Sequence, residues 1–151
     1  MAIKQKTTIS ATIKSSNPSH SLCECSVRDV NFKIDEPVER GGTNLGPSPT
    51  ETVIAALIGC TNVIANKCAD KLGIDIGHLA IDATYSFDRR GAMLMEEVDV
   101  PFPKITLNII SDGTATQAEL ENVSRELNRF CPVSKVFRHA GTQIEEIWSK
   151  A

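Results

Sequence analysis

The spacing of apolar and polar residues changes along the chain, and it predicts where strands and helices lie. Alternation with a period of two indicates a strand, because successive side chains of a strand point to opposite faces. Such segments predict strands over residues 3–14, 20–27, 29–35, 78–87, 104–111 and 143–148. Longer segments with capping residues predict helices over residues 49–72, 116–130 and 132–139. Strands and helices are grouped in this order, which favours an α+β fold over a doubly wound sheet.

The predicted helix over residues 49–72 has clear signals at both ends. Ser48 and Glu51 have the spacing of a capping box, Pro49 suits the first helical position, and Gly73 is a typical C-terminal stop. Six consecutive apolar residues, 53–58, cover almost the whole circumference of the early turns. A helix that is apolar all round is buried, so we expect this helix at the centre of the core.

Two segments read as irregular. Residues 40–49 hold three glycines and two prolines, and residues 88–103 hold an Arg-Arg-Gly turn, an acidic pair and two prolines. We find no internal repeat and no interdomain linker, and we predict one domain over residues 1–151.

Composition and charge narrow the class of protein. Hydrophobic residues make up 41% and charged residues 23%, as in ordinary globular proteins. The net charge of −3, without a basic block, argues against a nucleic-acid or anionic-membrane partner. No apolar run reaches the ~18 residues of a membrane span, and the N-terminus lacks the apolar region of a secretory signal. Five cysteines in such a chain indicate a reducing, cytoplasmic location, where a disulfide is transient or catalytic.

Two cysteines are candidates for chemistry. Cys60 follows Gly59 inside the apolar helix and needs a positive partner to become a reactive thiolate; Arg40, at the start of the glycine-rich loop, is our candidate. Cys131 stands at a helix break before Pro132, where the next helix dipole can stabilise a thiolate. The alternatives are that Cys60 is an inert core residue and that Cys131 only packs at the junction.

The other candidates have simpler interpretations. Cys23 and Cys25 share one strand face near His20, but no second ligand pair completes a zinc site, so we interpret them as packing residues. We assign Cys68 no role. Structural roles are expected for His78, His139 and the Arg89-Arg90 turn.

Two motifs resemble those of the OsmC/Ohr family. Residues 41–51, Gly-Gly-Thr-Asn-Leu-Gly-Pro-Ser-Pro-Thr-Glu, and the apolar helix to Cys60 are similar to the first motif. Residues 131–136, Cys-Pro-Val-Ser-Lys-Val, are similar to the second. The resemblance implies antiparallel sheets around a long buried central helix and an intertwined homodimer with two sites at the subunit interface. It also implies thiol-dependent reduction of hydrogen peroxide or organic hydroperoxides, without a metal or organic cofactor.

The resemblance also implies roles for individual residues. Cys60 matches the peroxidatic cysteine and Cys131 the resolving one, so a Cys60–Cys131 disulfide is expected. Arg40 is the best match to the arginine that supports the thiolate. Well-studied members carry a glutamate ten residues before the reactive cysteine, and this chain has Thr50 there. Glu51 is one residue later, about 100° round the helix, and it either acts in the site or only caps the helix.

We therefore expect a cysteine-based peroxidase that an external dithiol regenerates. Two alternatives use the same fold. In the first, the chain is a redox sensor whose disulfide is a switch without turnover. In the second, it binds a small apolar ligand and both cysteines are structural.

Overall fold

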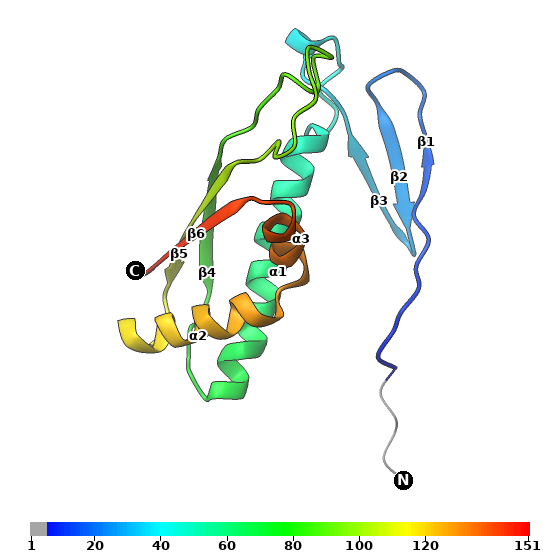
Figure 1. Cartoon of the computed structure of the whole chain (residues 1–151). Helices are drawn as coiled ribbons and strands as arrows, with labels where there is room; N and C mark the ends of the chain where they lie inside the picture. Colours follow the sequence, from blue (N-terminus) through cyan, green and yellow to red (C-terminus); the bar gives the residue numbers. More distant parts are fainter. Residues whose placement is uncertain (1–5) are drawn as a thin grey trace. The chain divides into compact units, whose positions relative to one another are not determined.

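The computed structural model of the chain describes residues 6–151. It forms two compact units, residues 1–53 and 54–151, which are described separately below. The helices and strands of each unit are labelled in Figure 1. One domain over the whole chain stays a prediction. The α+β fold class is confirmed, with three strands first and then a long helix, two strands, two helices and a last strand.

The first unit is built on a small antiparallel sheet. Its strands are β1 (Lys14–Ser16), β2 (Cys23–Val27) and β3 (Val30–Ile34), in the order β1-β2-β3. The turn between β2 and β3 lies at residues 28–29, as predicted, and Arg28 adopts a positive φ of 53° there. A short 3-10 helix, η1 (Val38–Arg40), follows the sheet.

The predicted strand over residues 3–14 is wrong for most of its length. Residues 3–5 lie outside the described part of the chain, and residues 6–13 have no regular structure. The reason is the length of the partner strand. Lys14 pairs with Ser26, so a residue before position 13 would face the β2–β3 turn and find no backbone partner. Alternation alone does not make a strand, and Ile9 and Ile13 remain exposed.

Asp35, just after β3, anchors the glycine-rich loop. Its buried carboxylate accepts hydrogen bonds from the backbone N–H groups of Glu36 (2.8 Å), Thr43 (3.1 Å) and Leu45 (3.1 Å). The Thr43 hydroxyl donates a fourth at 2.5 Å. These bonds, the one from Thr43 first, hold the pKa of Asp35 well below its usual range despite burial.

The lowered pKa of Asp35 predicts acid sensitivity of the fold. A carboxyl group with a lowered folded pKa stabilises the fold above its unfolded pKa, about 3.9. That stability is lost as the pH falls from there towards the folded pKa. Asp35→Asn should therefore lower the urea midpoint at pH 7 and flatten its decline below pH ~4. Asp29→Asn, in the exposed β2–β3 turn, is the control. An unchanged pH profile in Asp35→Asn would contradict this assignment.

The long helix α1 (Pro49–Leu72) has the predicted bounds. Glu51 accepts a hydrogen bond from the Ser48 backbone N–H at 2.7 Å, and the Ser48 hydroxyl accepts one from the Glu51 N–H at 3.4 Å. This is the predicted capping box. The helix ends where Gly73 adopts a left-handed φ of 68°, which a side chain would disfavour.

The second unit contains a mixed sheet, which corrects the expectation of purely antiparallel sheets. Its strands β4 (Leu79–Tyr85), β5 (Lys104–Ser111) and β6 (Gln143–Lys150) lie in the order β4-β5-β6. The β4–β5 pair is antiparallel, whereas β5 and β6 run parallel. The helices α2 (Gln117–Phe130) and α3 (Pro132–His139) lie between β5 and β6 in the chain and allow the parallel return.

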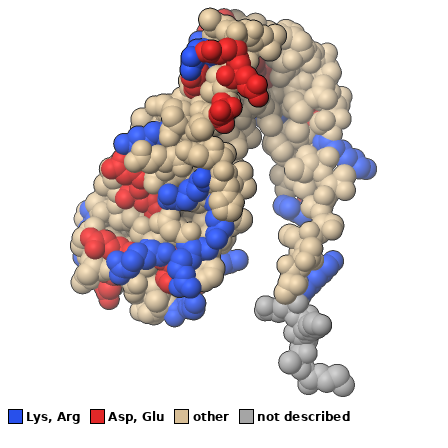
Figure 2. Space-filling model, in the orientation of Figure 1, with Lys and Arg blue, Asp and Glu red and all other residues tan. Residues whose placement is uncertain are grey.

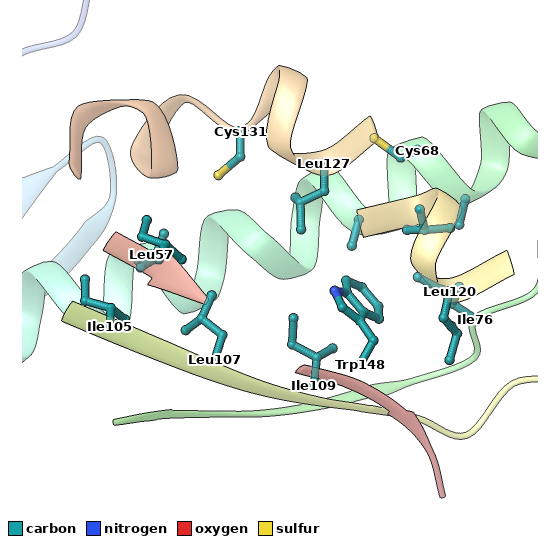
Figure 3. Packing of buried hydrophobic residues seen from close by; sticks show 14 of the residues in the cluster. Leu57, Cys68, Ile76, Ile105, Leu107, Ile109, Leu120, Leu127, Cys131 and Trp148 are labelled. Carbon is teal, nitrogen blue, oxygen red and sulfur yellow. The ribbon is translucent and has the colours of Figure 1, made fainter. Parts of the chain in front are cut away.

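The core of this unit fills the space between α1, α2, α3 and one face of the sheet. Figure 3 shows Leu107 and Ile109 of β5 and Trp148 of β6 reaching into it, with Leu57 of α1 and Leu120 of α2 on the other side. Alternate residues of β5 are buried, which is the period expected of a strand with one core face. A Thr116–Glu119 capping box starts α2, as predicted.

The expectation that α1 is buried on all sides is wrong for a single copy of the chain. Its buried residues follow one face of the helix, at positions 54, 57, 61, 65, 68 and 69. Val53 and Val63 are 37% and 51% exposed. By length and composition α1 could cross a membrane, because an 18-residue stretch of it has a mean hydropathy of 1.4, but core helices pass the same test. The side chains that α1 contributes to the core identify it as a core helix.

Charged side chains are of mixed sign on the face seen in Figure 2. Basic side chains gather over part of the second unit, and acidic ones lie beside them. This mixture agrees with the small net charge of −3.

Candidate dithiol site

Cys60 and Cys131 lie side by side, although 71 positions separate them in the sequence. The two Sγ atoms are 3.2 Å apart, and the Cys131 S–H donates to Cys60 Sγ. Cys60 is half-buried in the middle of α1, whereas Cys131 is fully buried. In Figure 3 the Cys131 side chain points from the α2–α3 junction towards α1. A disulfide bond is about 2.0 Å long, so a small movement of either side chain would allow one.

The helix break fixes the position of Cys131. Its backbone N–H donates to Leu127 O at 2.9 Å and ends α2, while its side chain accepts from the Ser134 N–H at 3.4 Å and starts α3. Pro132 occupies the first turn of α3, where its missing N–H costs nothing. One residue therefore caps both helices, and both helices hold its thiol.

Burial decides the protonation state of Cys131. It raises the pKa of this thiol to about 11, with a further contribution from Cys60, although the Ser134 N–H acts in the opposite direction. The first turn of α3 does lower the pKa of Cys131, in the predicted direction, but not enough to make this thiol a thiolate. The helix N-terminus does contact the sulfur, but the loss of solvation outweighs it. Cys131 is a neutral thiol and a hydrogen-bond donor at neutral pH.

A hydrogen-bonded group of residues that the sequence analysis did not identify is connected to Cys131. Arg138 Nε donates to the buried Ser134 Oγ at 3.2 Å, and Arg138 Nη2 donates to Asn128 Oδ1 at 2.7 Å. Ser134 in turn holds the Cys131 sulfur through its backbone N–H. The spacing of four between Ser134 and Arg138 on a helix was the available signal. These hydrogen bonds stabilise the first turn of α3, which contacts the Cys131 thiol.

Arg40 and Glu51 belong to the first unit. Arg40 Nε pairs with Glu36 Oε2 at 2.8 Å, at the end of η1. The carboxylate of Glu51 is engaged by the Ser48 cap, and these bonds, with a smaller effect of Arg40, lower its pKa. Capping thus accounts for Glu51. A role for either residue beside Cys60 stays a prediction.

The remaining cysteines and His78 make local contacts of their own. Cys68 is buried near the end of α1, and burial raises the pKa of its thiol. His78 lies 3.5 Å from Asp112 at the surface. Cys23 and Cys25 form a second close pair, with 3.4 Å between their Sγ atoms. Over residues 6–151, no group of three or more His, Cys, Asp or Glu side chains is placed to hold a metal ion.

Comparisons with known proteins identify the family and the fold. A sequence profile described as OsmC-like protein matches residues 42–146, which include both cysteines of the 3.2 Å pair. The chain belongs to the OsmC-like family. The family resemblance of the two motifs is thereby confirmed. No curated protein matches the chain in sequence.

Solved structures share the OsmC-like fold at low sequence identity. An OsmC-like protein from Mycoplasma pneumoniae is 16% identical, with a TM-score of 0.79 over 95% of this chain and 98% of that one. An organic hydroperoxide resistance protein OsmC from Legionella pneumophila is 17% identical, with a TM-score of 0.65 over 97% and 99%. The organic hydroperoxide resistance protein OhrB of Bacillus subtilis is 15% identical, with a TM-score of 0.62 over 95% and 98%. At these identities the likeness establishes the fold.

Proposed function

We propose that this chain is a thiol-dependent peroxidase that reduces organic hydroperoxides through Cys60 and Cys131. The observation that carries the proposal is the 3.2 Å distance between the two Sγ atoms. The names of the OsmC and OhrB relatives, which describe organic hydroperoxide resistance, support the same class of substrate.

Within this proposal, the difference in burial between the two thiols supports one assignment of their roles. Cys60 is the more accessible sulfur and accepts the hydrogen bond, so it is the attacking group. Cys131 is fully buried and neutral, so it resolves the intermediate rather than attacking the peroxide. Arg40 is the cation that we propose to support the Cys60 thiolate, because arginine stays charged and has a fixed donor geometry.

The reaction then proceeds in three balanced steps. The Cys60 thiolate attacks one oxygen of ROOH, the O–O bond breaks, and Cys60 becomes a sulfenic acid while RO⁻ takes a proton and leaves as ROH. The Cys131 thiol condenses with the sulfenic acid, which forms the disulfide and releases water. An external dithiol reduces the disulfide by two exchange steps and becomes oxidised itself. No metal or organic cofactor takes part.

The test is peroxide consumption by the reduced protein. One equivalent of cumene hydroperoxide should disappear, two thiols should be lost, and peptide mapping should find a Cys60–Cys131 bond. With an excess of dithiothreitol, consumption should continue over many turnovers. A disulfide that forms without turnover would replace the peroxidase with the redox sensor. If the peroxide persists and Cys60 and Cys131 stay free thiols, the peroxidase and redox-sensor hypotheses are both rejected. The binding of a small apolar ligand would then remain.

We also propose that the chain acts as a cytoplasmic homodimer. Ala56, Cys60 and Val63 follow one another at helical spacing on α1, so the accessible side of Cys60 shares a face with exposed apolar residues. A second copy would cover this face and shield the thiol from bulk water. The family resemblance implies the same partner, and the odd count of five cysteines favours a reducing compartment such as the cytoplasm.

A further inference from the structure

The first unit holds a pair of thiols that the proposed peroxidase does not use. Cys23 and Cys25 are two residues apart on β2, so both side chains point to the same face of the sheet. Their Sγ atoms are 3.4 Å apart and share a hydrogen bond. Ladder pairing on β3 holds the strand here, with Cys23 opposite Ile34 and Cys25 opposite Phe32.

The two faces of this sheet differ in polarity. Residues directly opposite one another in a ladder share a face, so Ile34 and Phe32 lie on the face of the two thiols. The other face carries a Lys33–Glu24 ion pair at 2.9 Å. Cys25 is buried and Cys23 half-buried. The two thiols therefore lie beside apolar side chains, and Cys23 is partly open to solvent.

The distance between the sulfurs selects the kind of atom that could bridge them. With element–sulfur bonds of about 2.3 Å, as for zinc, a sulfur separation of 3.4 Å corresponds to an S–X–S angle of about 95°. A linear ion would need the sulfurs farther apart, and so would a tetrahedral one. A pyramidal three-coordinate centre with angles near a right angle matches the pair as it stands.

We propose that Cys23 and Cys25 form a second dithiol site, which captures trivalent arsenicals. For phenylarsine oxide the reaction is a condensation that leaves arsenic trivalent. Both S–H bonds and the arsenic–oxygen bond break, two As–S bonds form, and the two protons leave with the oxygen as one water molecule. The phenyl group, as third substituent, would lie beside the apolar side chains of Phe32 and Ile34 on the same face.

Protonation favours an arsenical over a divalent metal ion at this pair. The hydrogen bond with Cys23, together with burial and the charge of Cys23, raises the pKa of Cys25. Binding of a metal ion requires both thiols to lose their protons, and this pair offers only two of the four ligands of a closed zinc site. Condensation with an arsenical consumes neutral thiols and leaves no net charge among the apolar side chains.

A disulfide between Cys23 and Cys25 is the less favourable product. Alternate Cα atoms of a strand are about 6.6 Å apart, close to the upper end of the 4.4–6.8 Å range that disulfides span. Closing the sulfurs to about 2.0 Å would pucker β2 between its two partner strands. A bridging arsenic atom needs no such movement.

The test uses the full-length chain with Cys60→Ser and Cys131→Ser, which removes the first dithiol and leaves Cys23, Cys25 and Cys68. One equivalent of phenylarsine oxide should add one phenylarsenic group, reduce the free thiols from three to one, and map to the 23–25 peptide by mass spectrometry. The adduct should survive excess glutathione and be reversed by a dithiol. Because β2 need not move, the adduct should not lower the melting temperature.

Three single replacements in that background complete the test. Cys23→Ser and Cys25→Ser should each weaken binding at least ~10²-fold, since each loses the second, intramolecular bond. Cys68→Ser should leave it unchanged. Loss of the adduct to glutathione, an adduct that includes Cys68, or a lowered melting temperature would each overturn the proposal. None of these outcomes depends on peroxidase activity, so failure here and failure of the proposed function remain distinguishable.

Discussion

Replacing Cys60 with serine should abolish peroxide consumption altogether, whereas replacing Cys131 should abolish only turnover. Cys60→Ser removes the accessible sulfur, and the buried, neutral Cys131 cannot replace it as a nucleophile. Cys131→Ser keeps the attacking thiol and should still reduce about one equivalent of peroxide, because the first step needs only one sulfur. The Cys60 sulfenic acid should then persist and be trapped by dimedone. Stopped assays of cumene hydroperoxide and intact-protein mass spectra measure both effects.

Cys68→Ser is the matched control for these two variants. Cys68 lies on the same helix and is buried, but it is not part of the 3.2 Å pair. This variant should consume peroxide at the rate of the unmodified chain. The opposite pattern for the other two, with Cys131→Ser inactive and Cys60→Ser reducing one equivalent, would reverse the assigned roles. Equal loss in all three would indicate that packing, not chemistry, is affected.

Placing a charge at Val63 should separate the proposed dimer into monomers. Val63 is 51% exposed in the single chain, so Val63→Glu should have little effect on the folding of one copy. In a dimer that covers this face of α1, the carboxylate would be buried without a partner, at a cost of about 3–5 kcal/mol. That cost corresponds to a dissociation constant raised roughly 10²–10⁴-fold. Analytical ultracentrifugation over a range of concentrations would measure it against the chain mass of 16.4 kDa.

Ile110→Glu is the control for the dimer experiment. Ile110 is 40% exposed on β5, between the buried Ile109 and Ser111, so it points to the sheet face away from the core. This variant carries the same new charge on another surface and should remain a dimer. A monomeric unmodified chain, or a Val63→Glu variant with unchanged association, would contradict the proposed dimer. A monomeric Val63→Glu variant with reduced peroxidase activity would link the covering of α1 to the site.

Local chemistry made several elements predictable from the sequence. The Ser48 cap, Pro49 and Gly73 fix both ends of α1 through interactions within a few residues of the chain. The same holds for the Thr116–Glu119 box and for Pro132, which allows one helix to follow another directly. The strand β5 was predictable because its alternate residues meet one core.

The sequence-based predictions that proved wrong depended instead on contacts between distant parts of the chain. Residues 6–13 alternate like a strand, but β2 is too short to pair with them. The run of apolar residues in α1 predicted burial all round, yet its exposed side depends on what covers it. The parallel pairing of β5 with β6 depends on how α2 and α3 return the chain across the sheet. In each case the deciding partner is distant in sequence.

The features of the candidate site also fall into two groups, those set by local sequence and those set by tertiary contacts. The sequence by itself determined the two motifs, the helix that carries Cys60 and the helix break that carries Cys131, because capping and proline geometry act over short distances. Only the tertiary structure brought the two sulfurs to 3.2 Å and raised the pKa of Cys131 to about 11. Sulfur proximity depends on how α1 packs against the α2–α3 junction. The pKa depends on how much water that packing removes, and neither quantity is local to the residues concerned.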